Sequence, residues 1–468
     1  METEASATEL SALLEQGKIT SLALLEQYLA RIEAHNPKLH AVLELAADAR
    51  EQAARLDAER AQGQVRSALH GLPILLKDNL DTADTLHTSA GSLALAEHRA
   101  SADSEVARRL RAAGLLILGK ANMTEWANFM TTGMPNGYSS RGGQTVNPYN
   151  PQVHTGGSSS GSAVAVAADL APLAIGTETS GSILSPASQN CLVGVKPTVG
   201  LVSRRGIIPI SHSQDTAGPI AKTVRDAAAL LSVIAGPDPA DPATARALEG
   251  TDFTSALRAD ALPGVRFDLV RGVLARLSED ERSVYLGAVE TLKGLGAEVI
   301  EVDFQDPGAL HSGFEVLVYE FKPGLNRYLA GTEGPRSIAE LMAFGDADPE
   351  RRLRYGQVLL QAAQGTRGDL SEGGYRYARA RDLRICKEQG IDALLYGQQL
   401  EALLFPQNWG AGVAAKAGYP SVTVPAGMGA NGVSVNLTFT GDAYSEMRLL
   451  QLAYAFEQAT RVRRPPAL

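Results

Sequence analysis

Cysteine is nearly absent from this chain, whose 468 residues include only Cys191 and Cys386. Two cysteines cannot form a disulfide framework, and neither has a histidine or another cysteine at the spacing of metal ligands. Isolated cysteines of this kind are most often small core residues in proteins of a reducing compartment. We therefore expect a cytoplasmic protein in which both thiols are buried.

Basic charge is also scarce, since the formal net charge is -9 and the pI is about 5.5. Such a surface is unsuited to wrapping nucleic acid or binding an anionic membrane, so we expect neither partner. No apolar run approaches the roughly 20 residues of a membrane span. The opening METEASATELSALLEQ lacks the basic and apolar regions of a signal peptide. Without an HxH or HExxH pair among its eight histidines, the sequence predicts no metal site.

The first 62 residues have the periodicity of helices. Apolar side chains recur every three or four residues behind a start at Thr20, namely Leu22, Leu25, Leu29 and Ile32. Pro37 predicts the end of this helix, and the Ala-rich residues 41–62 predict another. We expect this helical N-terminal segment to pack on the body of the protein.

From about residue 70, short apolar runs alternate with glycine-punctuated loops and helical patterns. Buried strands are predicted at residues 74–76, 115–118, 173–175, 299–302, 402–405 and 422–424, and a half-buried strand at 265–270. Helices are predicted at residues 104–113, 162–169, 283–295 and 445–459. This alternation indicates an α/β fold with a large sheet covered by helices on both faces. No long linker interrupts it, so we expect a single domain over residues 1–468.

Two familiar motifs are poor guides to this chain. Residues 114–120, GLLILGK, have the glycine and lysine spacing of a phosphate-binding loop, but Ala121 replaces the Ser or Thr that binds magnesium, and the residues between the glycines suit a strand. Residues 157–161, GSSSG, match the nucleophile elbow of Ser-His-Asp hydrolases, but turn-forming residues precede them where a strand is required. Only His212 and His311 follow, so that hydrolase is the weaker hypothesis.

Two serine-rich turns and one lysine stand out instead. The turns are residues 156–162, GGSSSGS, and residues 176–183, GTETSGSI, and each leads into a predicted helix. Free backbone N–H groups at a helix N-terminus can hold a developing anion. Lys77 ends the apolar run LPILLK, where burial would lower its pKa toward about 7–8 and make it a base. A serine hydroxyl needs such a base to become a nucleophile.

These motifs together resemble the amidase signature family. The resemblance rests on HGLPILLKDN from His70, GGSSSGSA from Gly156 and GTETSGSI from Gly176, with LGKANMTEW, GVKPTVG, QDTAGP and AGYPSVTVP in the expected order around them. It spans nearly the whole chain, with a catalytic core at about residues 65–235 and a variable region at about 240–400. It implies the amidase signature fold and a hydrolase of amide C–N bonds that needs no metal or organic cofactor.

The resemblance also implies a site. Ser182 would be the nucleophile, Ser158 a bridging serine after a cis peptide bond, and Lys77 the base. The oxyanion hole would be formed by the backbone N–H groups of Thr179, Ser180, Gly181 and Ser182. Substrate-binding residues would be Met130, Gly157 and Ser159. An acyl-enzyme on Ser182 would then be cleaved by water.

The chain departs from the family pattern at a few positions. Ser180 and Leu184 stand where the family usually has Gly and Arg, and Cys191 replaces a glycine. Ser180 need not abolish catalysis, since oxyanion-hole donors are backbone groups, but its side chain would narrow or polarise the site. Glu178 and Asp215 are interpreted as structural.

Three functional hypotheses remain open. Loops at residues 138–149 and 206–211 resemble those of bacterial peptide amidases, which predicts a small-molecule or peptide amide substrate and a monomer or homodimer. The alternative is a glutaminase-type subunit of a tRNA-dependent amidotransferase complex, which would be poorly active without its partners. A catalytically silent binding protein is disfavoured by the intact triad.

Overall fold

The computed structural model describes residues 4–311 and 313–468. Eleven strands form one mixed sheet in the order β1-β3-β2-β6-β8-β7-β12-β13-β11-β9-β10. They are β1 (Val42–Leu45), β2 (Pro73–Lys77), β3 (Leu116–Ala121), β6 (Leu173–Glu178), β7 (Val193–Lys196), β8 (Thr216–Ala221), β9 (Arg266–Val270), β10 (Glu298–Val302), β11 (Ala402–Pro406), β12 (Ser421–Met428) and β13 (Ser434–Thr440). A separate hairpin joins β4 (Tyr138–Ser139) to β5 (Gly143–Gln144). β2 is parallel to both β3 and β6, and β9 to both β10 and β11; the other pairs are antiparallel.

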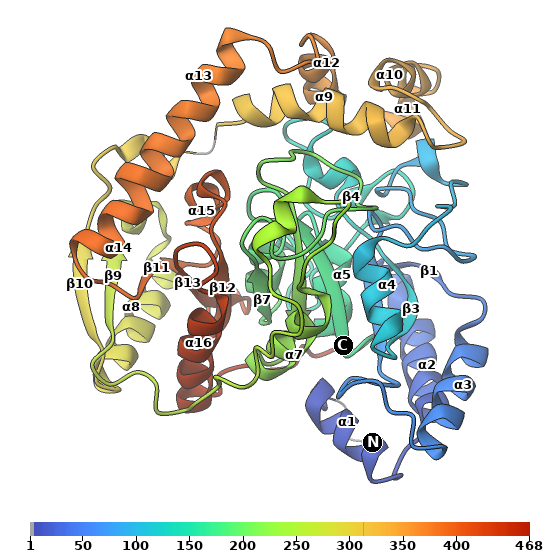
Figure 1. Cartoon of the computed structure of the whole chain (residues 1–468), viewed down its shortest axis with the longest axis horizontal. Helices are drawn as coiled ribbons and strands as arrows, with labels where there is room; N and C mark the ends of the chain where they lie inside the picture. The colour runs from blue at the N-terminus through green and yellow to red at the C-terminus, as the bar shows by residue number, and fades with distance from the viewer. Residues whose placement is uncertain (1–3, 312) are drawn as a thin grey trace.

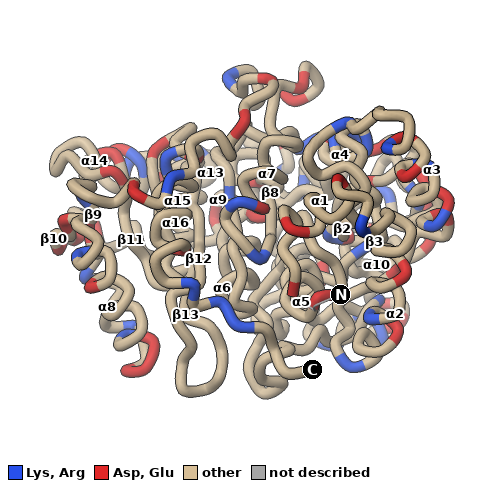
Figure 2. Tube along the Cα trace, turned by 90° about the horizontal axis from the view of Figure 1, so that it is seen from below, with Lys and Arg blue, Asp and Glu red and all other residues tan. Residues whose placement is uncertain are grey.

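Helices cover both faces of this sheet (Figures 1 and 2). The helices are α1 (Ala7–Glu15), α2 (Ser21–Leu39), α3 (Ala49–Ala61), α4 (Glu105–Ala112), α5 (Ser160–Ala167), α6 (Leu184–Gln189), α7 (Val224–Ile234), α8 (Glu279–Gly294), α9 (Glu315–Leu329), α10 (Ile338–Asp346), α11 (Pro349–Arg352), α12 (Val358–Gln364), α13 (Gly373–Asp382), α14 (Ala393–Gly397), α15 (Ala411–Ala417) and α16 (Glu446–Thr460). One layer contains α4, α7 and α16, and the opposite layer contains α5, α6 and α8. The predicted single-domain α/β fold with a large mixed sheet is confirmed.

Helices α9 to α13 lie together at one end of the molecule (Figure 1), and we call them the roof. Their apolar side chains form a second core with residues from the 90–138 region. Phe321 on α9 stacks against Phe129, with ring centroids 4.9 Å apart. The roof is therefore held to the body by its own hydrophobic cluster rather than by the sheet.

The N-terminal prediction was wrong in two details. Residues 41–62 are not one helix, because β1 pairs antiparallel with β3 and α3 begins only at Ala49. Pro37 does not end the preceding helix, which continues to Leu39 and stops where His40 adopts a φ of 50°. The other predicted helices and strands are present, with boundaries shifted by a few residues.

Burial was misjudged for two neighbouring strands. β10 is the edge strand, so Glu298 and Glu301 are exposed and the strand is not buried as predicted. β9 lies between β10 and β11, so four of its five residues are buried, including Asp268. The apolar-polar alternation of β9 indicated a half-buried strand, but position in the sheet decides burial.

Three global features bear on the sequence expectations. Both cysteines are free and buried, as expected. Within the described ranges, no helix has the length and apolar character needed to cross a membrane. Lys, Arg, Asp and Glu are interspersed along the chain trace (Figure 2).

Candidate active site

Lys77, the last residue of β2, is fully buried beneath the carboxyl end of the central strands. Its Nζ lies 2.8 Å from Ser158 Oγ, 3.0 Å from the Thr177 carbonyl oxygen and 2.9 Å from Thr177 Oγ1. β2 and β6 are parallel neighbours, which is why Lys77 and Thr177 meet although 100 residues separate them. The Lys77 amine is thus surrounded by three oxygen atoms, and no carboxylate of residues 4–311 and 313–468 forms an ion pair with it.

Burial sets the charge state of this lysine. Desolvation lowers the pKa of Lys77 to about 7, although the charges of Glu178 and Asp215 counteract this. A neutral amine has two N–H groups and one lone pair. The three neighbours match that form: the Thr177 oxygens can accept both hydrogens, and the lone pair can accept the Ser158 hydroxyl proton.

The first serine turn is held in place by hydrogen bonds to β6 and to the second turn. The Gly157–Ser158 peptide bond is cis, and the turn leads directly into α5. Ser159 Oγ donates to the Thr177 carbonyl (3.1 Å) and accepts from the Thr177 N–H (3.2 Å), so both its hydrogen-bonding roles are used within the protein. The Ser159 N–H donates to the Ser182 carbonyl at 3.1 Å, which joins the two serine turns through their backbones.

Glu178 organises the second turn. Its carboxylate accepts from the N–H groups of Gly181 (2.7 Å), Ile183 (2.7 Å) and Leu184 (3.0 Å), which begin α6. This matches its interpretation as a structural residue, because a carboxylate at a helix N-terminus satisfies amides and opposes the dipole. Ser182 lies between these amides with 8 % of its surface exposed.

Not all four backbone N–H groups of the expected oxyanion hole are free to bind a ligand. The Gly181 N–H already donates to Glu178, whereas those of Thr179, Ser180 and Ser182 have no acceptor in residues 4–311 and 313–468. Gly181 has a φ of +87°, which favours glycine and turns the chain at this point. Three backbone donors thus remain for a ligand.

Asp215 supports the second turn from β8's side. It accepts from Thr179 Oγ1 at 2.5 Å and from the N–H groups of Ile210 and Ser211 at 2.8 and 2.9 Å. Burial raises the pKa of Asp215 to about 6, although these hydrogen bonds oppose the shift. The carboxyl is thus a structural link between the 204–216 loop and the turn.

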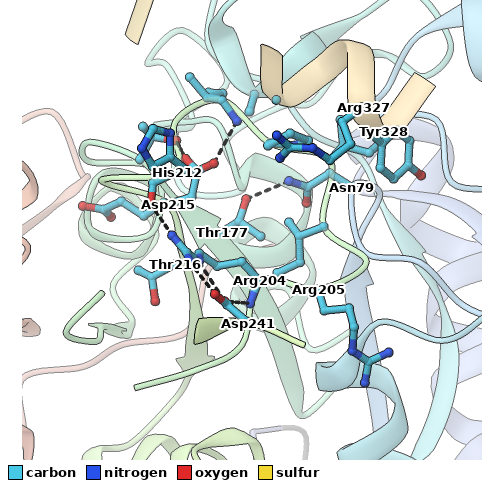
Figure 3. Close-up of a pocket in the computed structure, with 18 of the residues that line it drawn as sticks. Asn79, Thr177, Arg204, Arg205, His212, Asp215, Thr216, Asp241, Arg327 and Tyr328 are labelled. Atoms are coloured by element: carbon cyan, nitrogen blue, oxygen red, sulfur yellow. Dashed lines mark hydrogen bonds and ion pairs between the residues drawn. The ribbon is translucent and has the colours of Figure 1, made fainter. Parts of the chain in front are cut away.

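A cavity of about 330 Å³ opens beside the second turn (Figure 3). Asn79, Thr177, Glu178 and Thr179 line one side, and Arg204, Arg205 and the 207–216 loop another. Helix α9 closes it with Gly324, Arg327 and Tyr328. We call the strand ends and turns of residues 77–79, 156–162 and 176–182 the floor, because they carry the candidate chemistry below this roof.

The sequence-predicted residues differ in their relation to the cavity. Thr179 lines it. The other predicted site residues are not among its lining residues, namely Lys77, Met130, Gly157, Ser158, Ser159, Ser180, Gly181 and Ser182. Met130 is buried in the roof's apolar cluster, and its carbonyl accepts from the amides of Leu359 and Leu360. The Ser158 and Ser182 hydroxyls are not hydrogen-bonded to each other in the described chain.

The two departures from the family pattern have different settings. Leu184 is completely buried at the start of α6, so no arginine-sized polar group is accommodated there. Ser180 is partly exposed at the tip of the turn. The first is a packing position, whereas the second is a partly exposed position of the turn that is not among the residues lining the cavity.

The rejected motifs are explained by the structure. Residues 114–120 lead into and form β3, and Lys120 Nζ is buried against Leu80 O (2.6 Å) and Thr88 Oγ1 (2.8 Å). His311 Nδ1 lies 3.1 Å from the Pro307 carbonyl, far along the chain from Ser159, whose hydroxyl is bound to Thr177. No group of three or more His, Cys, Asp or Glu side chains suited to a metal occurs among the described residues.

Sequence reasoning missed several residues of this region. Thr177 and Asn79 lie inside the quoted motifs. Thr177 is on β6, the parallel neighbour of β2, and Asn79 follows Lys77 in the turn after β2, so their places near Lys77 were a usable signal. Asn79 Nδ2 donates to Thr177 Oγ1 at 3.0 Å. Arg327 and Tyr328 lie in the variable region, where no pattern marked them.

The chain is similar to known amidases over almost its whole length. A profile described as Amidase matches residues 23–450. The chain is 40% identical to a probable amidase of Arabidopsis thaliana, over 99% of this chain and 91% of that protein. It is 34% identical to a glutamyl-tRNA(Gln) amidotransferase subunit of Thermosynechococcus vestitus, over 97% of each.

Among solved structures, native peptide amidase from Stenotrophomonas maltophilia superposes with a TM-score of 0.95 at 46% identity, over 99% of this chain and 98% of that one. The family match and this structural similarity define the class as hydrolases of amide C–N bonds. The chain belongs to the amidase family, in its amidase signature form.

Proposed function

We propose that the chain hydrolyses carboxamides through an acyl-enzyme on Ser182, with Ser158 and Lys77 as a proton relay. The main support for this proposal is the distance of 2.8 Å between Ser158 Oγ and Lys77 Nζ, together with the burial that lowers the pKa of Lys77 to about 7. A base that is half neutral near pH 7 can accept a hydroxyl proton at working pH.

The reaction balances as follows. Lys77 takes the Ser158 proton, Ser158 takes the Ser182 proton, and Ser182 Oγ bonds to the amide carbonyl carbon. The free amides of Thr179, Ser180 and Ser182 stabilise the oxyanion, with Gly181 left to Glu178. The tetrahedral species then expels the amine, which takes a proton back from Lys77 through Ser158. Water cleaves the ester, restoring Ser182 and releasing the acid.

We further propose C-terminal peptide amides as substrates. The support is the 46% identity and near-complete coverage shared with the Stenotrophomonas maltophilia peptide amidase. A cavity of about 330 Å³ beside the turn offers room for one or two residues of an acyl chain. A role in an amidotransferase complex is a second candidate, but the identity of 34% to that relative is lower.

Ser182→Ala tests the assignment. Pure protein is incubated with primary amides, peptide amides, anilides and esters, and ammonia or amine release is followed. Wild type should act on peptide amides, and Ser182→Ala should lose at least about 10³-fold in kcat. The matched control is Ser180→Ala in the same turn, which should stay within about fivefold.

Two results would contradict this proposal. Full activity of Ser182→Ala would remove the nucleophile assignment. A lone chain inactive on peptide amides, but hydrolysing glutamine when combined with partner proteins, would favour the amidotransferase candidate. Size-exclusion chromatography of the active species tests the expected monomer or homodimer.

A further inference from the structure

Among the arginines that line the cavity, Arg327, which is exposed, differs from the others in having no ion-pair partner within the described chain. Arg204 binds Asp241 in a bidentate pair, with nitrogen–oxygen distances of 2.8 and 2.5 Å. Arg205 binds Asp238 at 2.9 Å and also Glu105. In the part of the chain that the structure describes, Arg327 has neither an ion pair nor a hydrogen bond through its side chain, although it lines the same cavity. Figure 3 shows it on α9, beside Tyr328 and across from Arg204.

The cavity's carboxylates do not supply the missing partner. Glu178 accepts three backbone amides, and Asp215 accepts a hydroxyl and two amides. Their oxygens thus accept from neutral donors of the second turn and of the 204–216 loop, and neither carboxylate forms an ion pair with Arg327. An anion entering the cavity would be repelled from the floor and attracted toward Arg327.

The helix that carries Arg327 is fixed at both ends of the cavity. Glu320, seven residues earlier, accepts from Ser211 Oγ at 2.5 Å and from the Ser213 N–H at 3.1 Å. Tyr328 donates to Asp81 at 2.6 Å. Gly324 lies between them and faces Pro209, which a Cβ at this position would reach at an ordinary contact distance of 3.4 Å. The guanidinium therefore extends from an anchored helix.

A second group in the cavity also lacks a partner. Asn79 is only 2 % exposed, and its Oδ1 has no hydrogen-bond donor within the described chain, while its Nδ2 is bound to Thr177. A buried acceptor without a donor is costly, so a ligand N–H in the cavity would relieve it. Peptide bonds carry such N–H groups.

We propose that the cavity selects amides whose acyl part is a peptide with an acidic side chain, bound by Arg327, with a peptide N–H donated to Asn79. This inference rests on the proposed peptide-amide function and narrows its substrate class. Arg327 is then a specificity-determining residue that acts on binding and not on the chemical step.

The test compares N-acetyl dipeptide amides that carry Glu, Gln or Lys, placed at either of the two positions, by kcat/KM for ammonia release. Wild type should prefer the better Glu substrate over its Gln counterpart by about three- to tenfold at low salt, and the preference should shrink as ionic strength rises. Arg327→Gln should abolish the preference, and Arg327→Glu should reverse it toward Lys.

Arg336→Gln is the matched control, because Arg336 is an exposed arginine nine residues further along that does not line the cavity. It should leave the Glu preference unchanged. Equal rates for Glu, Gln and Lys substrates in wild type, or a preference that survives Arg327→Gln, would overturn the inference while leaving the amidase function intact. If no peptide amide is hydrolysed, both proposals fall.

Discussion

The floor and the roof are built in opposite ways, although residues of both line the cavity. In the floor, Lys77, Ser159 and Glu178 are buried, and their polar atoms are bound by neighbours at fixed positions. The roof is joined to the body by apolar packing and by a few polar links, such as Tyr328 to Asp81. The comparison teaches that the proposed chemistry lies where buried polar atoms are held by several hydrogen bonds, whereas the proposed acyl-binding side is held mainly by apolar packing.

The largest loss of activity is expected when the proposed base of the floor is removed. Lys77→Met should lower kcat on peptide amides by about 10³- to 10⁴-fold, since a general base is lost. Thermal stability should be retained, because an apolar side chain of similar length avoids the desolvation cost of the amine. Kinetics and thermal unfolding of the same sample separate the two effects. Activity within tenfold of wild type would exclude Lys77 as the base.

The hydrogen bonds of the floor can be weakened one at a time. Ser159→Ala removes both a donor and an acceptor of Thr177, so the free energy of unfolding should fall by about 1–3 kcal/mol. Ser162→Ala, on the same helix, removes only one bond, to the Ile175 carbonyl, and should cost less. Denaturant titration measures both. Equal losses would mean that the second hydrogen bond between Ser159 and Thr177 adds no stability.

The pH profile should sharpen the comparison. Because the pKa of Lys77 is lowered to about 7 and the neutral amine is the active form, kcat/KM should rise with pH through about 7 and then level off. Asp215 raises the pKa of Lys77, so Asp215→Asn should move this rise to lower pH by up to about one unit. Glu290→Gln, an equal change of net charge on exposed α8, is the control. A shift to higher pH would refute the electrostatic link.

The smallest effect is expected in the roof. Tyr328→Phe removes the hydrogen bond to Asp81 and should raise KM about two- to threefold with kcat nearly unchanged. Tyr319→Phe, also on α9 but outside the cavity lining, should change neither. Steady-state kinetics on one peptide amide suffices. A large fall in kcat for Tyr328→Phe would show that roof and floor are not separable.

The sequence predicted the floor better than the roof for a physical reason. Apolar runs before Lys77 and before Gly176 mark buried strands, and strand ends bring their next residues to one edge of a sheet. By contrast, the Arg327 position depends on how α9 packs across the 204–216 loop. That packing arises between segments more than 100 residues apart, which no local pattern encodes.

Strand prediction failed where composition was misleading. β8 reads TAGPIA and β13 reads SVNLTFT, so glycine, proline or polar residues conceal strands that are buried throughout. β1 is short and only half buried at the sheet's edge. Their pairing with neighbours, and not their own propensity, makes them strands.

The route of the chain through β9 has a consequence for engineering. β10 ends at Val302 and β11 begins at Ala402, and both strands pair with β9, one on each side. Residues 303–401, which include the roof, therefore leave the sheet and return to it beside a single strand. Such an excursion can be exchanged for that of a relative without rethreading the sheet, and we expect chimeras joined at these two points to fold with the donor's selectivity.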